Sequence, residues 1–234
     1  MRNPAPVPTI QNRLLAALPE VVYQRLSPHF EAITLEHGAV LYEMEAPIDY
    51  FYFPFDAVIS LVTQMEDGRI VEVGLVGNEG MTGLAALFGQ KVSAERALVQ
   101  IPNGGTRVKT AVILDEFKQQ GELHDACLTY ANFFMRQVTQ TAACNASHTV
   151  EERLARWLLM CRERARGDEL NLTQEFIAEM LGTRRATVNV AAVTLQTAGF
   201  IKYNRGRIKI IDLAGLEGFA CECYEAVKTE RASG

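Results

Sequence analysis

Hydrophobic residues recur along the chain with two periods, and the changes of period divide it into regions. Residues 11–32 repeat apolar side chains at helical spacing, with Pro19 and Pro28 dividing the stretch into short pieces. From Ile33 to Ile113 short β-rich runs alternate with glycine, proline and acidic turns, and Asp67-Gly68 is a strong hairpin turn. The predicted strands are 39–42, 50–53, 58–64, 71–76, 97–101 and 106–110. Short, regularly spaced strands are typical of an antiparallel sandwich or barrel.

Helical periodicity returns after Phe117 and continues to Ala165. Two apolar stripes run along residues 123–149, which predicts a helix buried on two sides. We expect one side to lie on the β domain and the other to pair with the same helix of a second subunit. Burial of both sides within one monomer is the alternative. The stripe assigned to dimerisation is Leu123, Cys127, Tyr130, Phe134 and Thr141, and the second stripe is Leu128, Ala131, Met135, Val138 and Ala142.

Residues 172–211 carry the most specific pattern, which is helix, tight turn, second helix and β-hairpin. Thr173 is placed to cap the first helix, Gly182 to turn the chain, and Thr183 to cap the second helix, which Gly199 ends. Two short strands follow, joined by a turn at 204–206. This order predicts a winged helix-turn-helix, a unit that presents one helix to the major groove of B-DNA.

The outward side of this unit supplies the candidate DNA contacts. Arg185 and Asn189 lie one helical turn apart, and basic residues crowd the hairpin. An arginine pair on a lone helix is usually a solvated face, but here the helix pair, the glycine turn and the basic hairpin occur together and in order. The candidate DNA-binding residues are Thr173, Gln174, Thr183, Arg184, Arg185, Thr187, Asn189, Lys202, Arg205 and Arg207.

The charge distribution supports the same interpretation, although the whole chain is acidic. The 234 residues carry a net charge of −5, which by itself argues against nucleic acid. Residues 151–212, however, hold 11 basic and 8 acidic side chains, a local charge of +3. Residues 1–150 hold 10 and 16, a local charge of −6. Phosphate contacts need local rather than global positive charge.

Targeting and cofactor signals are weak. The proline-rich first ten residues do not form a signal peptide, and no apolar run is long enough to span a membrane, so we expect a cytoplasmic protein. Its five cysteines fit reduced thiols better than a disulfide framework. The only close pair, Cys221-x-Cys223, lacks a nearby histidine in the sequence. We therefore expect no metal and no cofactor.

The segment LTQEFIAEMLGTRRATVNVAAVTLQTAGFI resembles the helix-turn-helix of the CRP/FNR superfamily of bacterial transcription regulators, and the resemblance extends over roughly residues 30–215. It implies an α+β fold: an N-terminal antiparallel β-roll over 1–118, a central dimerisation helix over 119–150 and a winged helix-turn-helix domain over 151–234. The β-roll would be a jelly roll like that of cyclic-nucleotide-binding domains. A homodimer would bind a two-fold-related site on double-stranded DNA, with RNA polymerase as a further candidate partner.

Carried over to this chain, the resemblance places Arg185 at the recognition arginine that contacts guanine. It places Thr173, Gln174, Thr183 and Arg184 near phosphates. Two positions depart from the family pattern. Ala186 stands where an acidic or polar residue often follows the arginine, and Val190 stands where a basic residue is common. We expect an operator that differs from the best-known consensus.

The sensing half departs further, so we expect no response to cAMP. Family members that bind cyclic nucleotides use a glutamate for the ribose and an arginine for the phosphate. In this chain Met81 and Glu95 align with those two positions, and a carboxylate would repel a phosphate. A one-residue shift would restore Arg96, so a cyclic-nucleotide-responsive regulator stays open as an alternative. The candidate effector pocket is Gly77, Glu79, Gly80, Met81, Thr82, Glu95 and Arg96, and a turn cassette without a ligand is the plainer interpretation.

Other functions lack their residues. An FNR-like iron–sulfur cluster needs an N-terminal cysteine group, but the first cysteine is Cys127, and a haem site would need an axial ligand in a β-roll that has only His29 and His37. A cupin-like enzyme would need converging histidines and a carboxylate. No common catalytic motif occurs, so we expect no enzyme. A cyclic-nucleotide-binding module without DNA binding is disfavoured by the basic hairpin. The β-roll either senses an unknown signal or binds no ligand.

Overall fold

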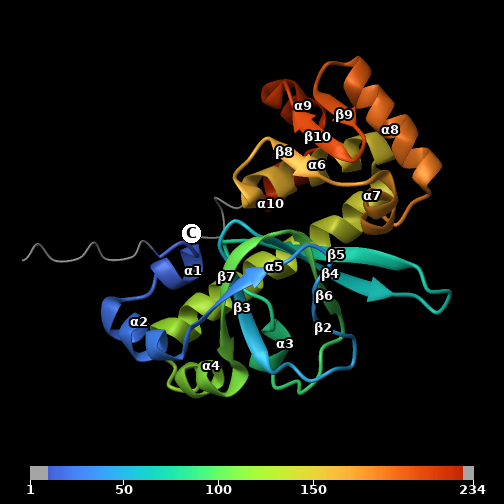
Figure 1. Ribbon diagram of the computed structural model, residues 1–234. Coiled ribbons are helices and arrows are strands. Elements are labelled where there is room, and N and C mark those ends of the chain that lie inside the picture. The colour runs from blue at the N-terminus through green and yellow to red at the C-terminus, as the bar shows by residue number, and fades with distance from the viewer. Residues whose placement is uncertain (1–9, 229–234) are drawn as a thin grey trace, which may run out of the picture.

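The computed structural model describes residues 10–228, which form a β-roll, one long helix and a smaller C-terminal lobe (Figure 1). The β-roll lies at the bottom of the view and the C-terminal lobe at the top, with the long helix α5 running along the roll and continuing towards the lobe. The expectation about the first ten residues falls almost entirely outside the described residues. The expected order of β-roll, long helix and helix-turn-helix is confirmed.

The β-roll consists of two antiparallel sheets with strand orders β1-β7-β3 and β2-β6-β4-β5. Its strands are β1 (Glu31–Leu35), β2 (Val40–Tyr42), β3 (Tyr50–Pro54), β4 (Val58–Gln64), β5 (Ile70–Val76), β6 (Arg96–Ile101) and β7 (Asn103–Lys109). The roll also holds the helices α1 (Arg13–Ala16), α2 (Glu20–Leu26), α3 (Leu84–Leu87) and α4 (Thr110–Phe117) and a 3₁₀ turn at Ser27–His29. All six predicted strands are present, and β1 and α4 are additional.

The prediction of helix over 11–32 is wrong at its end. The helical part stops at His29, and Glu31 begins β1, which pairs along its length with β7. The burial of β1 follows no clear alternation, since only Leu35 in it is buried. A strand that buries one side chain has almost no period-two signal, and so pairing with β7, rather than side-chain pattern, defines it.

The long helix α5 (Glu122–Ser147) covers one side of the β-roll, and the stripe assigned to dimerisation faces that roll. Leu123, Cys127, Tyr130 and Phe134 are buried in the core that α5 shares with the strands, and Thr141 is half-buried beside Arg156. This assignment is therefore wrong for the four buried residues, because the chain itself already covers them.

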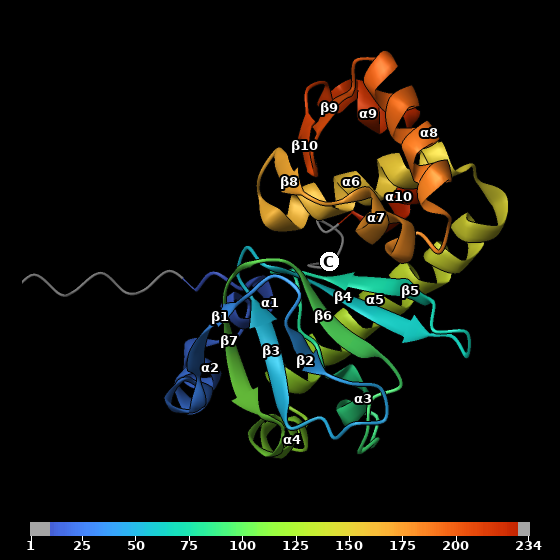
Figure 2. The ribbon, with the colours of Figure 1, turned by 45° about the vertical axis from the view of Figure 1, so that its right-hand side comes forward.

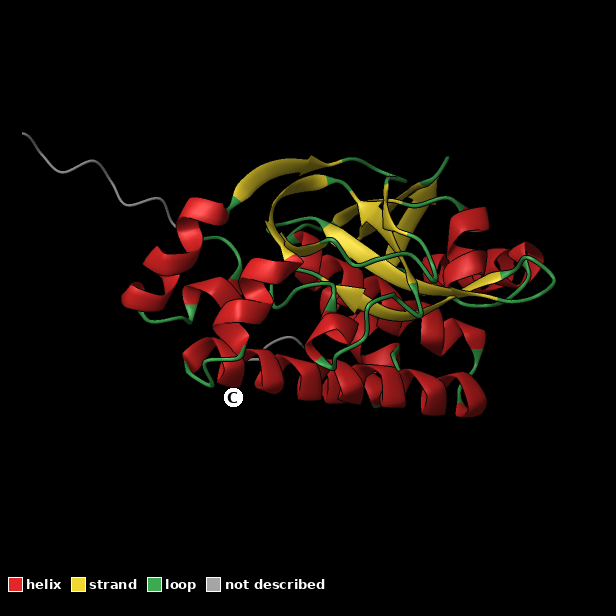
Figure 3. Ribbon diagram, turned by 90° about the horizontal axis from the view of Figure 1, so that it is seen from below, coloured by secondary structure: helices red, strands yellow, loops and turns green. Residues whose placement is uncertain are grey.

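The second stripe of α5 remains at the surface. In it Leu128 is 42% exposed and Met135 is 60% exposed, with Ala142 also exposed and Ala131 and Val138 half-buried. In Figure 3 the long helix forms one edge of the molecule, with the strands on one side of it only. The stripe that stays exposed is therefore the second one, not the one assigned to dimerisation.

The C-terminal lobe packs around α6 (Val150–Ala165). The remaining elements are β8 (Glu169–Asn171), α7 (Gln174–Met180), α8 (Arg185–Thr197), β9 (Ile201–Asn204), β10 (Arg207–Ile210), α9 (Leu213–Phe219) and α10 (Cys223–Val227). A capping box between Thr149 and Glu152 begins α6. The predicted packing of Leu154, Trp157, Leu158 and Cys161 beneath the helix-turn-helix is confirmed, since all four lie in one buried cluster with its apolar residues.

The β-roll and the C-terminal lobe share a buried junction. Strands β4 and β5 lie directly below α6 and α7 (Figure 2), and Leu75 belongs to the hydrophobic cluster of the lobe. The Trp157 indole Nε1 donates a hydrogen bond to Glu72 Oε1 at 2.8 Å. The Arg164 guanidinium pairs with the Glu79 carboxylate at 2.8 Å, with both side chains fully buried. The junction therefore fixes the lobe on the roll by polar contacts as well as by apolar packing.

Among the helices of residues 10–228, none is both long enough and apolar enough to cross a membrane.

Candidate nucleic-acid interface

The turn between α7 and α8 is built by local backbone chemistry. The Thr173 side chain accepts a hydrogen bond from the amide of Phe176 at 3.2 Å, which confirms its role as the cap of α7. Gly182 has φ +59°, a conformation that glycine adopts at little cost, as expected for this turn. Arg184, not Thr183, is the N-cap of α8, and no side chain caps that helix. The prediction that Thr183 caps α8 is therefore wrong.

Helix α8 presents its polar side outwards. Its inner stripe, Val188, Ala191, Ala192 and Leu195, is buried as predicted. Arg184, Arg185 and Asn189 are exposed. Arg185 makes only a 3.9 Å ion pair with Glu175, and both side chains are more than two-thirds exposed, so this pair holds the guanidinium weakly. The Gln174 amide Nε2 donates to Asn189 Oδ1 at 2.9 Å, which links the start of α7 to the second turn of α8.

The strands β9 and β10 form the predicted hairpin, with a two-residue turn at Arg205 and Gly206. Both turn residues have positive φ, 47° and 80°, the geometry that matches the twist of paired strands. Tyr203 fastens this hairpin to the helices. Its hydroxyl donates to the Leu172 carbonyl at 2.8 Å, and its amide donates to Gln196 Oε1 at 2.8 Å. The exposed basic side chains of the hairpin therefore lie on strands that hydrogen bonds hold against the helices.

The structure divides the predicted DNA-binding residues between two grooves. Thr173, Gln174, Arg185, Asn189 and Arg205 line one groove between α7, α8 and the hairpin. Thr183, Arg184, Arg185 and Thr187 line a second groove, which faces the β4–β5 turn of the β-roll. Lys202 and Arg207 are exposed on the hairpin strands and line neither groove. Arg185 is thus the predicted residue common to both.

Two valines complete the outer surface of α8. Val190 is 57% exposed and Val193 is 50% exposed. Apolar side chains on a helix that enters the major groove can contact thymine methyl groups. Sequence reasoning treated Val190 only as a departure from the family pattern and missed Val193. The signal was the helical period, since Val193 follows Asn189 by four residues on the same side.

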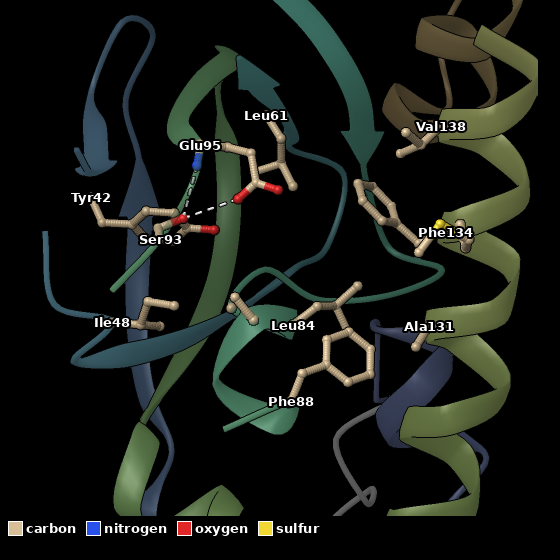
Figure 4. Close-up of a pocket in the computed structure, with 13 residues that line it drawn as sticks. Tyr42, Ile48, Leu61, Leu84, Phe88, Ser93, Glu95, Ala131, Phe134 and Val138 are labelled. Carbon is tan, nitrogen blue, oxygen red and sulfur yellow. Dashed lines mark hydrogen bonds between the residues drawn. The ribbon is translucent and has the colours of Figure 1, made fainter. Parts of the chain in front are cut away.

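The β-roll holds a separate apolar cavity of about 270 Å³ (Figure 4). It lies between the strands, α3 and α5, with Phe88, Phe134 and Val138 among its apolar lining residues. Its polar lining groups are Tyr42, Ser93 and Glu95. The Ser93 hydroxyl donates to Glu95 Oε2 at 3.1 Å. Of the predicted effector residues, only Glu95 lines this cavity.

The other predicted effector residues have structural contacts instead. Glu79 pairs with Arg164, and Met81 and Thr82 are fully buried. A side chain at Gly77 would collide with Arg164, and one at Gly80 would collide with Tyr130, so both glycines allow close packing of the cassette. This corrects the assignment of these residues to an effector pocket and agrees with the interpretation of the cassette as a structural turn.

Arg96 also lies outside the apolar cavity. It pairs with the Glu43 carboxylate and lines the groove towards the helix-turn-helix. The alternative alignment, shifted by one residue, would have made Arg96 a ligand for the cyclic phosphate. The structure does not place Arg96 in the cavity. Nothing basic lines the apolar cavity among the described residues.

The close cysteine pair has a histidine neighbour in three dimensions, although it lacks one in the sequence. His148 Nδ1 lies 3.6 Å from Cys223 Sγ. Together with Cys144, these residues form a cluster at the junction of α5, α6 and α10. Within residues 10–228 it is the one group of three or more potential metal ligands, and it is not in the β-roll, where a cupin-like site would be. Folding therefore brings to the cysteine pair a histidine that its sequence neighbourhood lacks.

Comparison with known proteins identifies one family. The family of Crp-like helix-turn-helix domains matches residues 152–219, a stretch that runs from within α6 to the end of α9. Among curated proteins, none matches the chain significantly.

Solved structures resemble almost the whole chain. FixK2 from Bradyrhizobium japonicum is 17% identical with a TM-score of 0.70, and the alignment covers 82% of this chain and 98% of that one. A CRP-family transcriptional regulator from Thermus thermophilus is 20% identical with a TM-score of 0.70, over 83% and 99%. The c-di-GMP-responsive regulator CLP from Xanthomonas campestris is 14% identical with a TM-score of 0.67, over 82% and 99%.

Proposed function

We propose that this chain, which carries a Crp-like helix-turn-helix domain on the fold of the CRP/FNR transcription regulators, is a homodimeric regulator that binds DNA sequence-specifically. The observation that carries the proposal is the outer surface of α8, where Arg185, Asn189 and two valines stand exposed beside a rigid basic hairpin. A helix of this kind enters the major groove, where side chains read base edges, while the hairpin cations contact phosphate.

Each exposed group has a chemical assignment. Arg185 would donate two hydrogen bonds to guanine, Asn189 would pair with adenine, and Val190 would contact a thymine methyl. The Glu175 carboxylate and the Gln174 amide hold Arg185 and Asn189 in the free protein. Both contacts are solvent-exposed, so a base edge can replace them at low cost.

A homodimer is supported by the exposed stripe of α5. Leu128 and Met135 are apolar, well exposed and seven residues apart, so they lie on one side of the helix. Two copies pairing through this stripe would set two α8 helices about one helical turn of DNA apart. RNA polymerase is a further proposed partner, and the bacterial cytoplasm is the proposed place of action.

Binding to random and specific duplexes across a salt series tests this function. Counterion release makes affinity fall steeply as salt rises, and each lost phosphate contact reduces the slope by about one. Arg205→Ala should weaken binding to all duplexes alike and reduce the slope by about one. A salt-independent affinity, or no retention on DNA at low salt, would contradict the proposal.

The cavity of the β-roll does not favour a cyclic nucleotide. A cyclic phosphate needs a cation, whereas the charged group that lines this cavity is the Glu95 carboxylate. We therefore propose a regulator that does not respond to cAMP. Calorimetry with cAMP and cGMP tests this, and micromolar binding of either would contradict it.

A further inference from the structure

Three cysteines and one histidine from distant parts of the sequence meet where α5, α6 and α10 converge. One ligand atom from each of Cys144, His148, Cys221 and Cys223 can be chosen so that all four lie within 4.8 Å of one another. The three cysteines are buried and form a cluster separate from the two hydrophobic cores. Three thiols and one imidazole are thus brought to one place by the fold.

The spacing of the atoms fits a single tetrahedral ion. Cys144 Sγ and Cys221 Sγ are 3.5 Å apart, and Cys223 Sγ and His148 Nδ1 are 3.6 Å apart. In a tetrahedral zinc site with the usual bond lengths, two sulfurs lie about 3.8 Å apart and a sulfur and a nitrogen about 3.6 Å apart. An iron–sulfur cluster holds at most two of its four ligands on one iron, and ligands on different irons lie further apart.

Local structure holds the ligands in pairs. Cys144 and His148 are four residues apart at the end of α5, and the His148 amide donates to the Cys144 carbonyl at 3.0 Å. Cys221 and Cys223 lie at the start of α10, where the Tyr224 amide donates to the Cys221 carbonyl at 3.0 Å. Two short ligand pairs from separate segments are the usual arrangement of a structural zinc site.

The surrounding groups match those around known zinc ligands. His148 Nε2 lies 3.2 Å from Glu222 Oε2, and a carboxylate on the second ring nitrogen orients a metal-binding histidine. The Gln140 amide Nε2 lies 3.0 Å from Cys223 Sγ, towards which it donates. The contact with Glu222 engages Nε2 and leaves His148 Nδ1 facing Cys223 Sγ at 3.6 Å.

A buried cation balances the charge. Arg156 is 3% exposed, and its Nε has no partner among the described residues. Its Nη1 donates to the Thr141 hydroxyl at 3.3 Å, three residues before Cys144 on α5, which places the guanidinium close to the cluster. Zn²⁺ with three thiolates and a neutral histidine carries one negative charge, which a neighbouring guanidinium compensates.

We propose that Cys144, His148, Cys221 and Cys223 bind one zinc ion. Because α5 ends at Ser147 and α6 begins at Val150, the ion would span the hinge between the long helix and the C-terminal lobe. It would fasten α10 to the end of α5 and so fix the lobe relative to the helix. Loss of zinc would loosen this attachment, which, on the proposed function, changes how α8 is presented to DNA.

Metal content and cobalt spectra of the full-length chain test the site without DNA. Protein purified under reducing conditions should contain one zinc per chain by elemental analysis. After exchange, Co²⁺ should give thiolate-to-cobalt charge transfer and the intense visible bands of tetrahedral cobalt. Cys144→Ser and Cys221→Ser should each abolish stoichiometric zinc. Cys127→Ser, a buried cysteine on the same helix but in the β-roll core, should keep it.

Several results would overturn the proposal. These are reduced wild-type protein that binds neither zinc nor cobalt, cobalt spectra without charge transfer, and full zinc content in both site variants. A Cys144–Cys221 disulfide in protein that takes up no metal after reduction would identify a redox pair instead. Because these measurements do not involve DNA, their failure would leave the proposed function standing. DNA affinity with and without chelator then tests the coupling separately.

Discussion

At the residue scale, the central prediction concerns Arg185. Arg185→Ala should lower the affinity for the specific site by about 1–3 kcal/mol and relax the preference at one base pair of each half-site. Its weak ion pair with Glu175 contributes little to folding, so the stability should change by less than about 1 kcal/mol. Competition binding with duplexes substituted at single positions measures the effect. Equal losses on specific and random duplexes would show a phosphate contact instead.

Glu72 makes the stability depend on pH. Burial raises its pKa to about 7, and the Trp157 indole and Ser60 hydroxyl oppose that shift. A carboxyl whose pKa is raised by folding stabilises the folded state below its unfolded pKa, and this contribution is lost as the pH rises through about 7. Between pH 5 and pH 8, wild type should lose about 2–3 kcal/mol relative to Glu72→Gln. Denaturant unfolding measures this, and parallel pH profiles of the two proteins would contradict it.

At the element scale, the two stripes of α5 give opposite predictions for the same kind of substitution. Met135→Asp puts a charge on the exposed stripe and should convert a dimer into a folded monomer in light scattering. Thr129→Asp, also exposed but on another side of the helix, should stay dimeric. Phe134→Asp should instead unfold the β-roll, because Phe134 is buried against Gly74. A Met135→Asp dimer of unchanged affinity would rule out this stripe as the interface.

The same helix shows what sequence can predict here. Short β-rich runs bounded by turn residues located the strands β2 to β7, including β3 and β4, whose side chains are buried on both sides. Helical periodicity located the helix-turn-helix. It also found both stripes of α5, but assigned Leu123, Cys127, Tyr130 and Phe134 to the dimer, since two apolar stripes do not reveal which one the chain itself covers. The cluster of cysteines and histidine was missed for a related reason, because His148 and Cys223 become neighbours only through the packing of α10 on α5.

At the scale of the whole molecule, the junction between the β-roll and the C-terminal lobe depends on Glu79 and Arg164. Their ion pair is fully buried, so Glu79→Gln would leave the guanidinium without its counter-charge. The free energy of unfolding should fall by about 3–5 kcal/mol. Replacing both residues, Glu79→Gln with Arg164→Met, should restore most of that loss, because no unpaired charge remains. A single variant as stable as wild type would show that the pair does not hold the lobe in place.

The most direct test of the account is selection of binding sites from randomised duplexes by the full-length protein. Two copies of α8 held by paired α5 helices should enrich a two-fold-symmetric sequence whose half-sites lie about one helical turn, roughly 10–10.5 base pairs, apart. Each half-site should contain a guanine whose enrichment disappears with Arg185→Ala. An unenriched pool, or a single asymmetric half-site that is insensitive to Arg185→Ala, would contradict the central claim that α8 reads DNA in a symmetric dimer.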